Sequence, residues 1–229
     1  MNTKNSIVVM KFGGTSVQDS TAIKNVINIV NNNSLKKVVV VSAISKATTA
    51  LENIARFAAE KNVQEAEKLL DEIINRHHVI INDLVTDTAL RSAAAEKIIG
   101  YHRQITELIK GLSIINELSL RILDAFRVFG ELMSSNVIYH AMVNAGLDVE
   151  LINSQHVIKT NNDFSRAYPN FEVSQVNSDK IVKPLLAKNK IVLAQGFMGS
   201  TDDGIPTTMG RESSDFSAAI YGSLVDADE

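Results

Sequence analysis

The chain of 229 residues contains no cysteine, which excludes disulfide bridges and cysteine-ligated metal sites. This composition suits a reducing compartment, and we expect a cytoplasmic protein. The chain also lacks an N-terminal basic segment followed by an apolar run, and no stretch of about 18 apolar residues occurs. Export and membrane insertion are therefore not expected.

Neither sign of charge is in large excess, because 23 Lys and Arg residues against 26 Asp and Glu residues give a net charge of −3. The basic residues are spread along the chain, so nucleic-acid binding is not expected and a small-molecule function fits better. The signature motifs of P-loop ATPases, Rossmann dehydrogenases, zinc proteases and α/β-hydrolases are missing. The five histidines lack the spacing of metal ligands, so no metal site is predicted.

The N-terminal pattern predicts an α/β protein with a sizeable core, since 45% of the residues are hydrophobic. Residues 7–12 form a continuous apolar run typical of a strand buried on both faces. Apolar residues then recur at helical spacing to about residue 31, with Ser20 and Thr21 as candidate caps. A second strand follows at 37–42, and this strand–helix–strand order predicts two parallel strands.

The middle of the chain, from about 47 to 146, carries no strand pattern and predicts a helical excursion. Gly130 is expected to interrupt or bend its last helix. Strands return at 149–152 and 191–195, with a helix between them from about 178 to 186. A final helix begins near Ser213 or Ser214, and residues 224–229 follow where another strand is expected, which suggests part of a longer protein.

The stretch "MKFGGTSV" places Lys11, Gly13 and Gly14 at the end of the first strand. Glycine lets backbone N–H groups face a ligand, and the carboxyl ends of parallel strands are where open sheets bind ligands. The pattern is compatible with a phosphate cradle, but also with a turn beside an exposed lysine.

Residues 210–215, "GRESSD", precede the final helix, whose N-terminus would favour an anion. Arg211 could hold a carboxylate or phosphate through its planar fork, or could be a solvated charge beside Glu212. Asp215 could be catalytic or could simply compensate the helix dipole.

Glu131 lies in the apolar segment "FGELMSS", where its carboxylate could receive an ammonium group. An ordinary pair with Arg127, one helical turn earlier, is an equally good reading and would contribute only about 0.2–0.5 kcal/mol. Hydroxyl side chains follow the second strand and could face the same crevice as Lys11, or could serve the loop and a helix cap: Ser42, Ser45, Thr48 and Thr49.

Four motifs together resemble the aspartokinase family, in this order and at suitable separations: "KFGGTSV", "VVVSAISKATTAL", "FGELMSS" and "GFMGSTDDGIPTTMGRESSDFSAA". They lie between residues 8 and 221, so the resemblance covers nearly the whole chain. The last two are most similar to the aspartokinase part of bifunctional aspartokinase–homoserine dehydrogenases.

The resemblance implies an amino-acid kinase fold, a three-layer α/β sandwich around a mainly parallel sheet. It implies phosphorylation of the side-chain carboxylate of L-aspartate by ATP with Mg²⁺, the first step towards lysine, threonine and methionine, and a homo-oligomeric full-length protein. The residue roles that it implies are these: Lys11 and Asp215 catalytic; Lys11, Gly13, Gly14 and Ser214 at the phosphates; Ser42, Thr48, Glu131 and Arg211 at aspartate.

Two departures from the family pattern stand out. Glu212-Ser213 replaces a pair that usually contains glycine, and the family's next strand, which contacts the nucleotide, would lie beyond Glu229. We therefore expect residues 1–229 to be the aspartate-binding part of the kinase domain, without its nucleotide-binding remainder or regulatory domains, and to turn over weakly or not at all alone. The alternatives are a kinase of glutamate, acetylglutamate or carbamate, and a non-catalytic aspartate-binding module.

Overall fold

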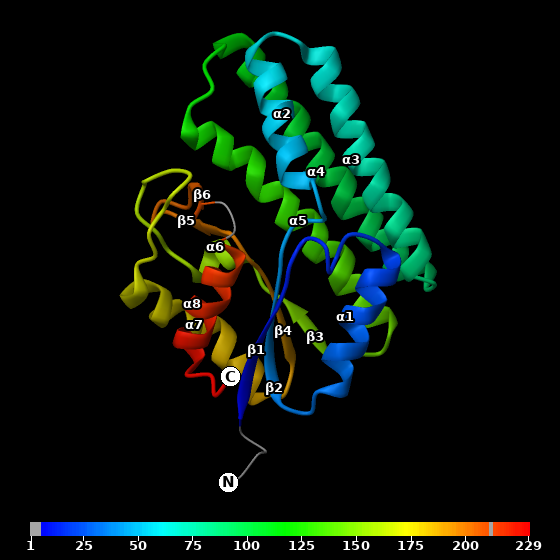
Figure 1. Ribbon diagram of the computed structural model, residues 1–229, viewed down its shortest axis with the longest axis vertical. Helices are drawn as coiled ribbons and strands as arrows, with labels where there is room; N and C mark the ends of the chain where they lie inside the picture. Colours follow the sequence, from blue (N-terminus) through cyan, green and yellow to red (C-terminus); the bar gives the residue numbers. More distant parts are fainter. Residues whose placement is uncertain (1–5, 211–212) are drawn as a thin grey trace.

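A computed structural model describes residues 6–210 and 213–229 (Figure 1). Four parallel strands form the central sheet in the order β1-β2-β4-β3. Their bounds are Ile7–Phe12 for β1, Lys36–Val41 for β2, Val149–Leu151 for β3 and Ile191–Gln195 for β4. The expected strands and their parallel pairing are confirmed.

Alternate residues of the sheet point into two separate hydrophobic cores, as the period of a strand requires. In β2, Val39 and Val41 join the core shared with α1 (Ser20–Asn32) and α5 (Leu120–Asn144). Val38 and Val40 join the core on the other face, beneath α7 (Phe171–Ala187) and α8 (Ser214–Val225). The layers are therefore helix, sheet and helix, as expected (Figure 1).

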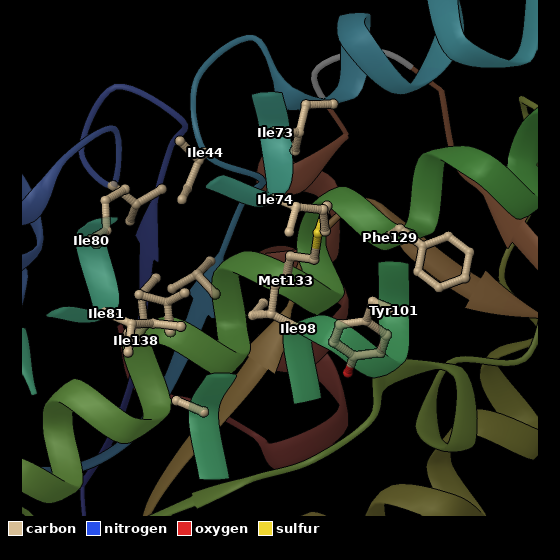
Figure 2. Packing of buried hydrophobic residues seen from close by; sticks show 14 of the residues in the cluster. Ile44, Ile73, Ile74, Ile80, Ile81, Ile98, Tyr101, Phe129, Met133 and Ile138 are labelled. Atoms are coloured by element: carbon tan, nitrogen blue, oxygen red, sulfur yellow. The ribbon is translucent and has the colours of Figure 1, made fainter. Parts of the chain in front are cut away.

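The helical excursion is confirmed and forms a bundle beyond the carboxyl edge of the sheet (Figure 1). It consists of α2 (Ala47–Ala59), α3 (Val63–Leu84), α4 (Thr88–Ile115) and α5. Figure 2 shows Met133 of α5 among isoleucines of α3 and α4, close to Tyr101 and Phe129. The rings of Tyr101 and Phe129 meet edge to face with centroids 5.8 Å apart, a favourable aromatic geometry.

Some local expectations were wrong. Of the two expectations for Gly130, the interruption is wrong, because α5 runs unbroken from Leu120 to Asn144. Asp19 caps α1 by accepting from the Ala22 amide, in place of Ser20 or Thr21. Helix α7 starts at Phe171, seven residues before the expected 178, because the Asn170 side chain accepts from the Val173 amide and caps it there.

Helix α6 (Ser154–Val157), which follows β3, and strand β5 (Met198–Ser200) were not foreseen. Strand β5 pairs antiparallel with β6 (Pro206–Thr208) in a small hairpin ahead of α8. After α8, the chain runs along the outer edge of β1. There the Asp228 amide donates to the Ile7 carbonyl oxygen, and the Val9 amide donates to the Glu229 carbonyl oxygen. No helix in the described part of the chain is long and apolar enough to cross a bilayer.

His77 gives a prediction about stability. This α3 residue is fully buried, and burial lowers its pKa from 6.5 to about 4. The unfolded chain binds the proton at higher pH than the folded chain, so the free energy of unfolding should fall by up to about 3 kcal/mol as pH drops between these two values. Urea unfolding of wild type and His77→Leu over this range checks this. Equal pH dependence in both proteins would refute it.

Gly130 gives a second prediction, because a Cβ at this position would lie 2.9 Å from the Cβ of Ala43. Gly130→Ala should therefore push α5 away from the loop after β2 and lower the free energy of unfolding by about 1–3 kcal/mol. The matched control is Gly111→Ala in α4, where a Cβ would meet nothing within 4 Å. That change should raise the free energy of unfolding by about 0.5–1 kcal/mol. Two losses of equal size would contradict the close-approach argument.

Candidate active site at the carboxyl edge of the sheet

A cavity of about 580 Å³ opens where β1 and β2 end, between the sheet and the helical bundle. The first turns of α2 and α8 also reach it, so two helix N-termini, each with partial positive charge, face the same space. The predicted residues that line it are Lys11, Gly13, Gly14, Ser42, Ser45, Thr48, Thr49, Glu131, Ser214 and Asp215. The structure thus brings together segments that are far apart in the sequence.

Lys11 places its ammonium group at the start of α8, where Nζ lies 2.9 Å from Oδ1 of Asp215. The two side chains are 27% and 76% exposed, so both remain accessible to a ligand. A Cβ on Gly13 would lie 3.3 Å from the Lys11 Nζ, and a Cβ on Gly14 would lie 3.1 Å from the Ala43 carbonyl oxygen. Glycine at both positions therefore leaves the backbone beside the ammonium open, as the phosphate cradle requires.

Ser42 and Ser214 are joined directly across the cavity floor, because the Ser42 hydroxyl donates to the Ser214 Oγ at 2.8 Å. Gly196, just after β4, permits this arrangement, since a Cβ there would lie 2.9 Å from the Ser214 Cβ. Ser213 occupies the N-cap position of α8 without a side-chain capping bond, and its buried Oγ has no partner among the described residues. The backbone N–H groups at the start of α8 are therefore available to a hydrogen-bond acceptor from a ligand.

Glu131 is buried at the inner wall of the cavity, with 3% of its surface exposed. Its Oε1 accepts from the Ala43 amide at 3.1 Å, and its Oε2 has no partner within the described residues. Burial raises the pKa of Glu131 from 4.5 to about 8. A cation brought to Oε2 would reverse this shift by favouring the ionised form.

The ordinary pairing of Glu131 with Arg127 is wrong. The Arg127 guanidinium instead contacts Glu52, with Nη2 2.7 Å from Oε1, and Asp124, with Nη1 3.4 Å from Oδ1. This leaves the Glu131 carboxyl group for a ligand. Arg211, the predicted carboxylate fork, lies outside the described residues.

Other residues at or next to the site had no signal in the sequence. Arg76 of α3 donates to the Ser45 carbonyl oxygen at 2.6 Å and to the Gln18 carbonyl oxygen at 2.8 Å. It therefore ties together the two loops that follow β1 and β2, although its partners are 31 and 58 residues away along the chain. Lys46, Glu52 and Phe197 line the cavity itself.

A larger cavity, of about 740 Å³, lies at the opposite edge of the sheet. Helices α1 and α7 end near it, and helix C-termini favour cations over anions. Two of its lysines already have partners: Lys37 donates to the carbonyl oxygens of Val30 and Asn33, and Lys190 pairs with Asp148 and Glu150. The carboxyl-edge cavity is therefore the better candidate for an anionic substrate.

The arrangement can accept an anion beside Lys11 and the two helix N-termini, and an ammonium group at Glu131. In residues 6–210 and 213–229, no cluster of three or more His, Asp or Glu side chains is placed to hold a metal ion.

Comparisons with known proteins identify relatives of this chain. The chain is 34% identical over 224 residues to the chloroplastic bifunctional aspartokinase/homoserine dehydrogenase 2 of Arabidopsis thaliana, covering 96% of this chain and 24% of that protein. It is 32% identical to the aspartokinase of Chlamydia trachomatis, covering 97% of this chain and 47% of that one. The chain thus spans a quarter to a half of the length of these relatives.

Among solved structures, aspartokinase III of Escherichia coli in complex with lysine and aspartate superposes with a TM-score of 0.88 at 29% identity, covering 97% of this chain and 48% of that one. Its complex with aspartate and ADP gives a TM-score of 0.85 with the same identity and coverage. The model of the amino acid kinase family matches residues 6–229. This chain is a member of the amino acid kinase family.

Proposed function

We propose that this chain is the amino-acid-binding part of an aspartokinase and takes part in phosphoryl transfer from MgATP to the side-chain carboxylate of L-aspartate. The observation that carries the proposal is the shared cavity, in which the Lys11 ammonium stands 2.9 Å from Asp215 and which is also lined by Glu131, whose buried Oε2 has no partner among the described residues. The similarity to aspartokinases along almost the whole chain supports the same conclusion.

The charges of the site match the charges of aspartate. Its α-ammonium group would bind Oε2 of Glu131, and Thr48 in the first turn of α2 offers a hydroxyl nearby. Arg211 is proposed to hold the α-carboxylate by its bidentate fork. With both α-groups fixed in this way, the side-chain carboxylate is the group left to face Lys11.

The transfer needs no general base, because a carboxylate with a pKa near 4 is already ionised at neutral pH. An oxygen of this carboxylate attacks the γ-phosphorus, the bond from phosphorus to the bridging oxygen breaks, and ADP leaves. The barrier comes from bringing two anions together, so charge compensation and alignment supply the catalysis. Lys11, Gly13, Gly14 and Ser214 supply positive charge and donors, while Mg²⁺ arrives with the nucleotide as part of the substrate.

Ligand-induced stabilisation separates this proposal from its alternatives. L-aspartate, L-glutamate, N-acetylglutamate and MgATP are each added to the purified chain, and the melting temperature is measured. We expect a rise with aspartate that exceeds the rise with the other amino acids. A larger rise with glutamate or N-acetylglutamate would replace aspartokinase by another kinase of the family. If nothing changes with aspartate, the proposal fails.

Lys11 gives a prediction about turnover. In the full-length enzyme, Lys11→Ala should lower kcat for ATP-dependent phosphorylation by about 100-fold or more, because an ammonium group that compensates the transferred charge is lost. The affinity for aspartate, measured by calorimetry, should change by only a few-fold. The control is Lys110→Ala in α4, which also removes a lysine paired with a carboxylate at 2.9 Å, with Glu107 as the partner. An unchanged kcat in Lys11→Ala would remove Lys11 from this role.

Glu131 gives a prediction about protons. One pH unit below its pKa of about 8 the free carboxyl group is mostly protonated. Binding of the substrate ammonium favours the ionised form, so aspartate should release about 0.9 proton there and about 0.1 one unit above the pKa. The affinity for aspartate should rise about tenfold between these two pH values, because the fraction of Glu131 that is ionised and able to bind the ammonium group rises by that factor.

Calorimetry in buffers of different ionisation enthalpy measures the protons released. Glu131→Gln is the matched control, since it keeps the size of the side chain and has no proton to release. If the heat of aspartate binding to wild type is the same in all buffers, no proton is released. That result would exclude the proposed contact between Glu131 and the ammonium group.

A further inference from the structure

A charged network lies just behind the candidate site, where α2, α5 and the β5–β6 hairpin meet. Its centre is Asp124 of α5, which is fully buried. Its Oδ2 accepts from the backbone amides of Ser165 at 2.7 Å and Thr208 at 2.9 Å. Its Oδ1 accepts from the hydroxyls of the same two residues, at 3.0 Å and 2.7 Å. A buried carboxylate is tolerated only with such complete pairing.

Arg127, one turn further along α5, extends this network to α2. Its Nε and Nη2 reach Oε1 of Glu52 at 2.8 Å and 2.7 Å, and its Nη1 donates to the Ser165 hydroxyl at 2.7 Å. The Arg127 side chain is only 12% exposed. The planar fork of a guanidinium can satisfy partners on both sides at once, which the single ammonium of a lysine cannot do at fixed positions.

The loop that joins this network is held in an uncommon conformation. Ser165 has a φ of 68°, in the left-handed region, which is unfavourable for residues other than glycine. Both its amide and its hydroxyl bond to Asp124, and its hydroxyl also accepts from Arg127. These bonds offset the strain, so the loop conformation depends on the network.

Each anchored segment carries a residue of the proposed site a short distance away. Glu52 follows Thr48 by one turn of α2, and Asp124 precedes Glu131 by two turns of α5. Thr208 ends β6, a few residues before α8 begins at Ser214. The network therefore touches all three segments that would bind the substrate, without lining the phosphate side at Lys11.

We propose that Arg127 is a positioning residue: together with Asp124 and Glu52 it holds α2, α5 and the end of β6 at the relative positions in which Thr48 and Glu131 share one cavity with the start of α8. This inference rests on the proposed function, because the site that it positions is the amino-acid site. Buried ionic networks often add little net stability compared with apolar packing. The directional geometry of this one therefore matters more for the site than for the free energy of folding.

The test compares Arg127→Lys with Lys190→Met, both kept well below their melting temperatures. Lys190 also links two carboxylates, Asp148 and Glu150, but does so at the opposite edge of the sheet. Arg127→Lys keeps the charge and loses the fork, so we expect the Kd for aspartate to rise about tenfold or more, since small misplacements of binding groups are costly. Lys190→Met should leave this Kd within a factor of about two, whatever it does to the melting temperature.

Hydrogen exchange of the ligand-free protein gives a second readout that needs no substrate. The backbone amides of Ser165 and Thr208 bond to Asp124, so they should exchange faster in Arg127→Lys than in wild type and Lys190→Met. If Arg127→Lys only lowers the melting temperature, with Kd and exchange unchanged, the positioning role is wrong. If wild type does not bind aspartate but the exchange difference is present, the proposed function fails and the network's hold on these segments stands.

Discussion

The close approach of α5 to the loop after β2 is the constraint on which the rest of the site depends. No side chain separates Gly130 from Ala43, so the helix backbone comes near enough for its neighbours to bond to that loop. Glu131 accepts from the Ala43 amide, and the Ser134 hydroxyl donates to the Ser42 carbonyl oxygen at 2.7 Å. The segment "GELMS" thus joins the bundle to the sheet and places a carboxyl group at the junction.

Around this junction, charge is divided between two sides of one cavity. Lys11 and the starts of α2 and α8 make one side attractive to anions, whereas the buried Glu131, whose Oε2 has no partner among the described residues, can receive a cation on the other side. A zwitterionic substrate with an additional carboxylate satisfies both sides at once. The opposite edge of the sheet has the reverse polarity, since helices end there and its lysines Lys37 and Lys190 are bonded to carbonyl oxygens and carboxylates.

The regular parts of the fold could be predicted from the sequence because they follow from local periodicity. The continuous apolar run of β1 and the helical spacing through 47–146 both correspond to observed elements. Strand β5 has only three residues and one of them is glycine, so it leaves too weak a pattern to be recognised. The early start of α7 depends on one capping bond from Asn170, which competes with other local conformations.

The candidate site could be predicted only where function requires particular residue types at fixed positions. Lys11, Glu131, Ser42 and Ser214 were identified in this way, and the structure places all four at one cavity. The partners of Arg127 and Arg76 could not be foreseen, because the choice among carboxylates and carbonyl groups is made by tertiary packing. Glu131, one turn away in the same helix, was the plausible local partner of Arg127, but its actual partner is Glu52, 75 residues away in the sequence.

The hydrogen bonds of Arg76 to the loops after β1 and β2 limit how this domain can be shortened. Its guanidinium bridges the turns that follow the first two strands, yet it belongs to the excursion that interrupts the α/β pattern. The excursion is therefore no dispensable insertion. A shortened protein that replaced it with a linker would lose the contact that Arg76 makes between the two turns and the packing of α5 on one face of the sheet, and any minimal version of this scaffold must supply both from another source.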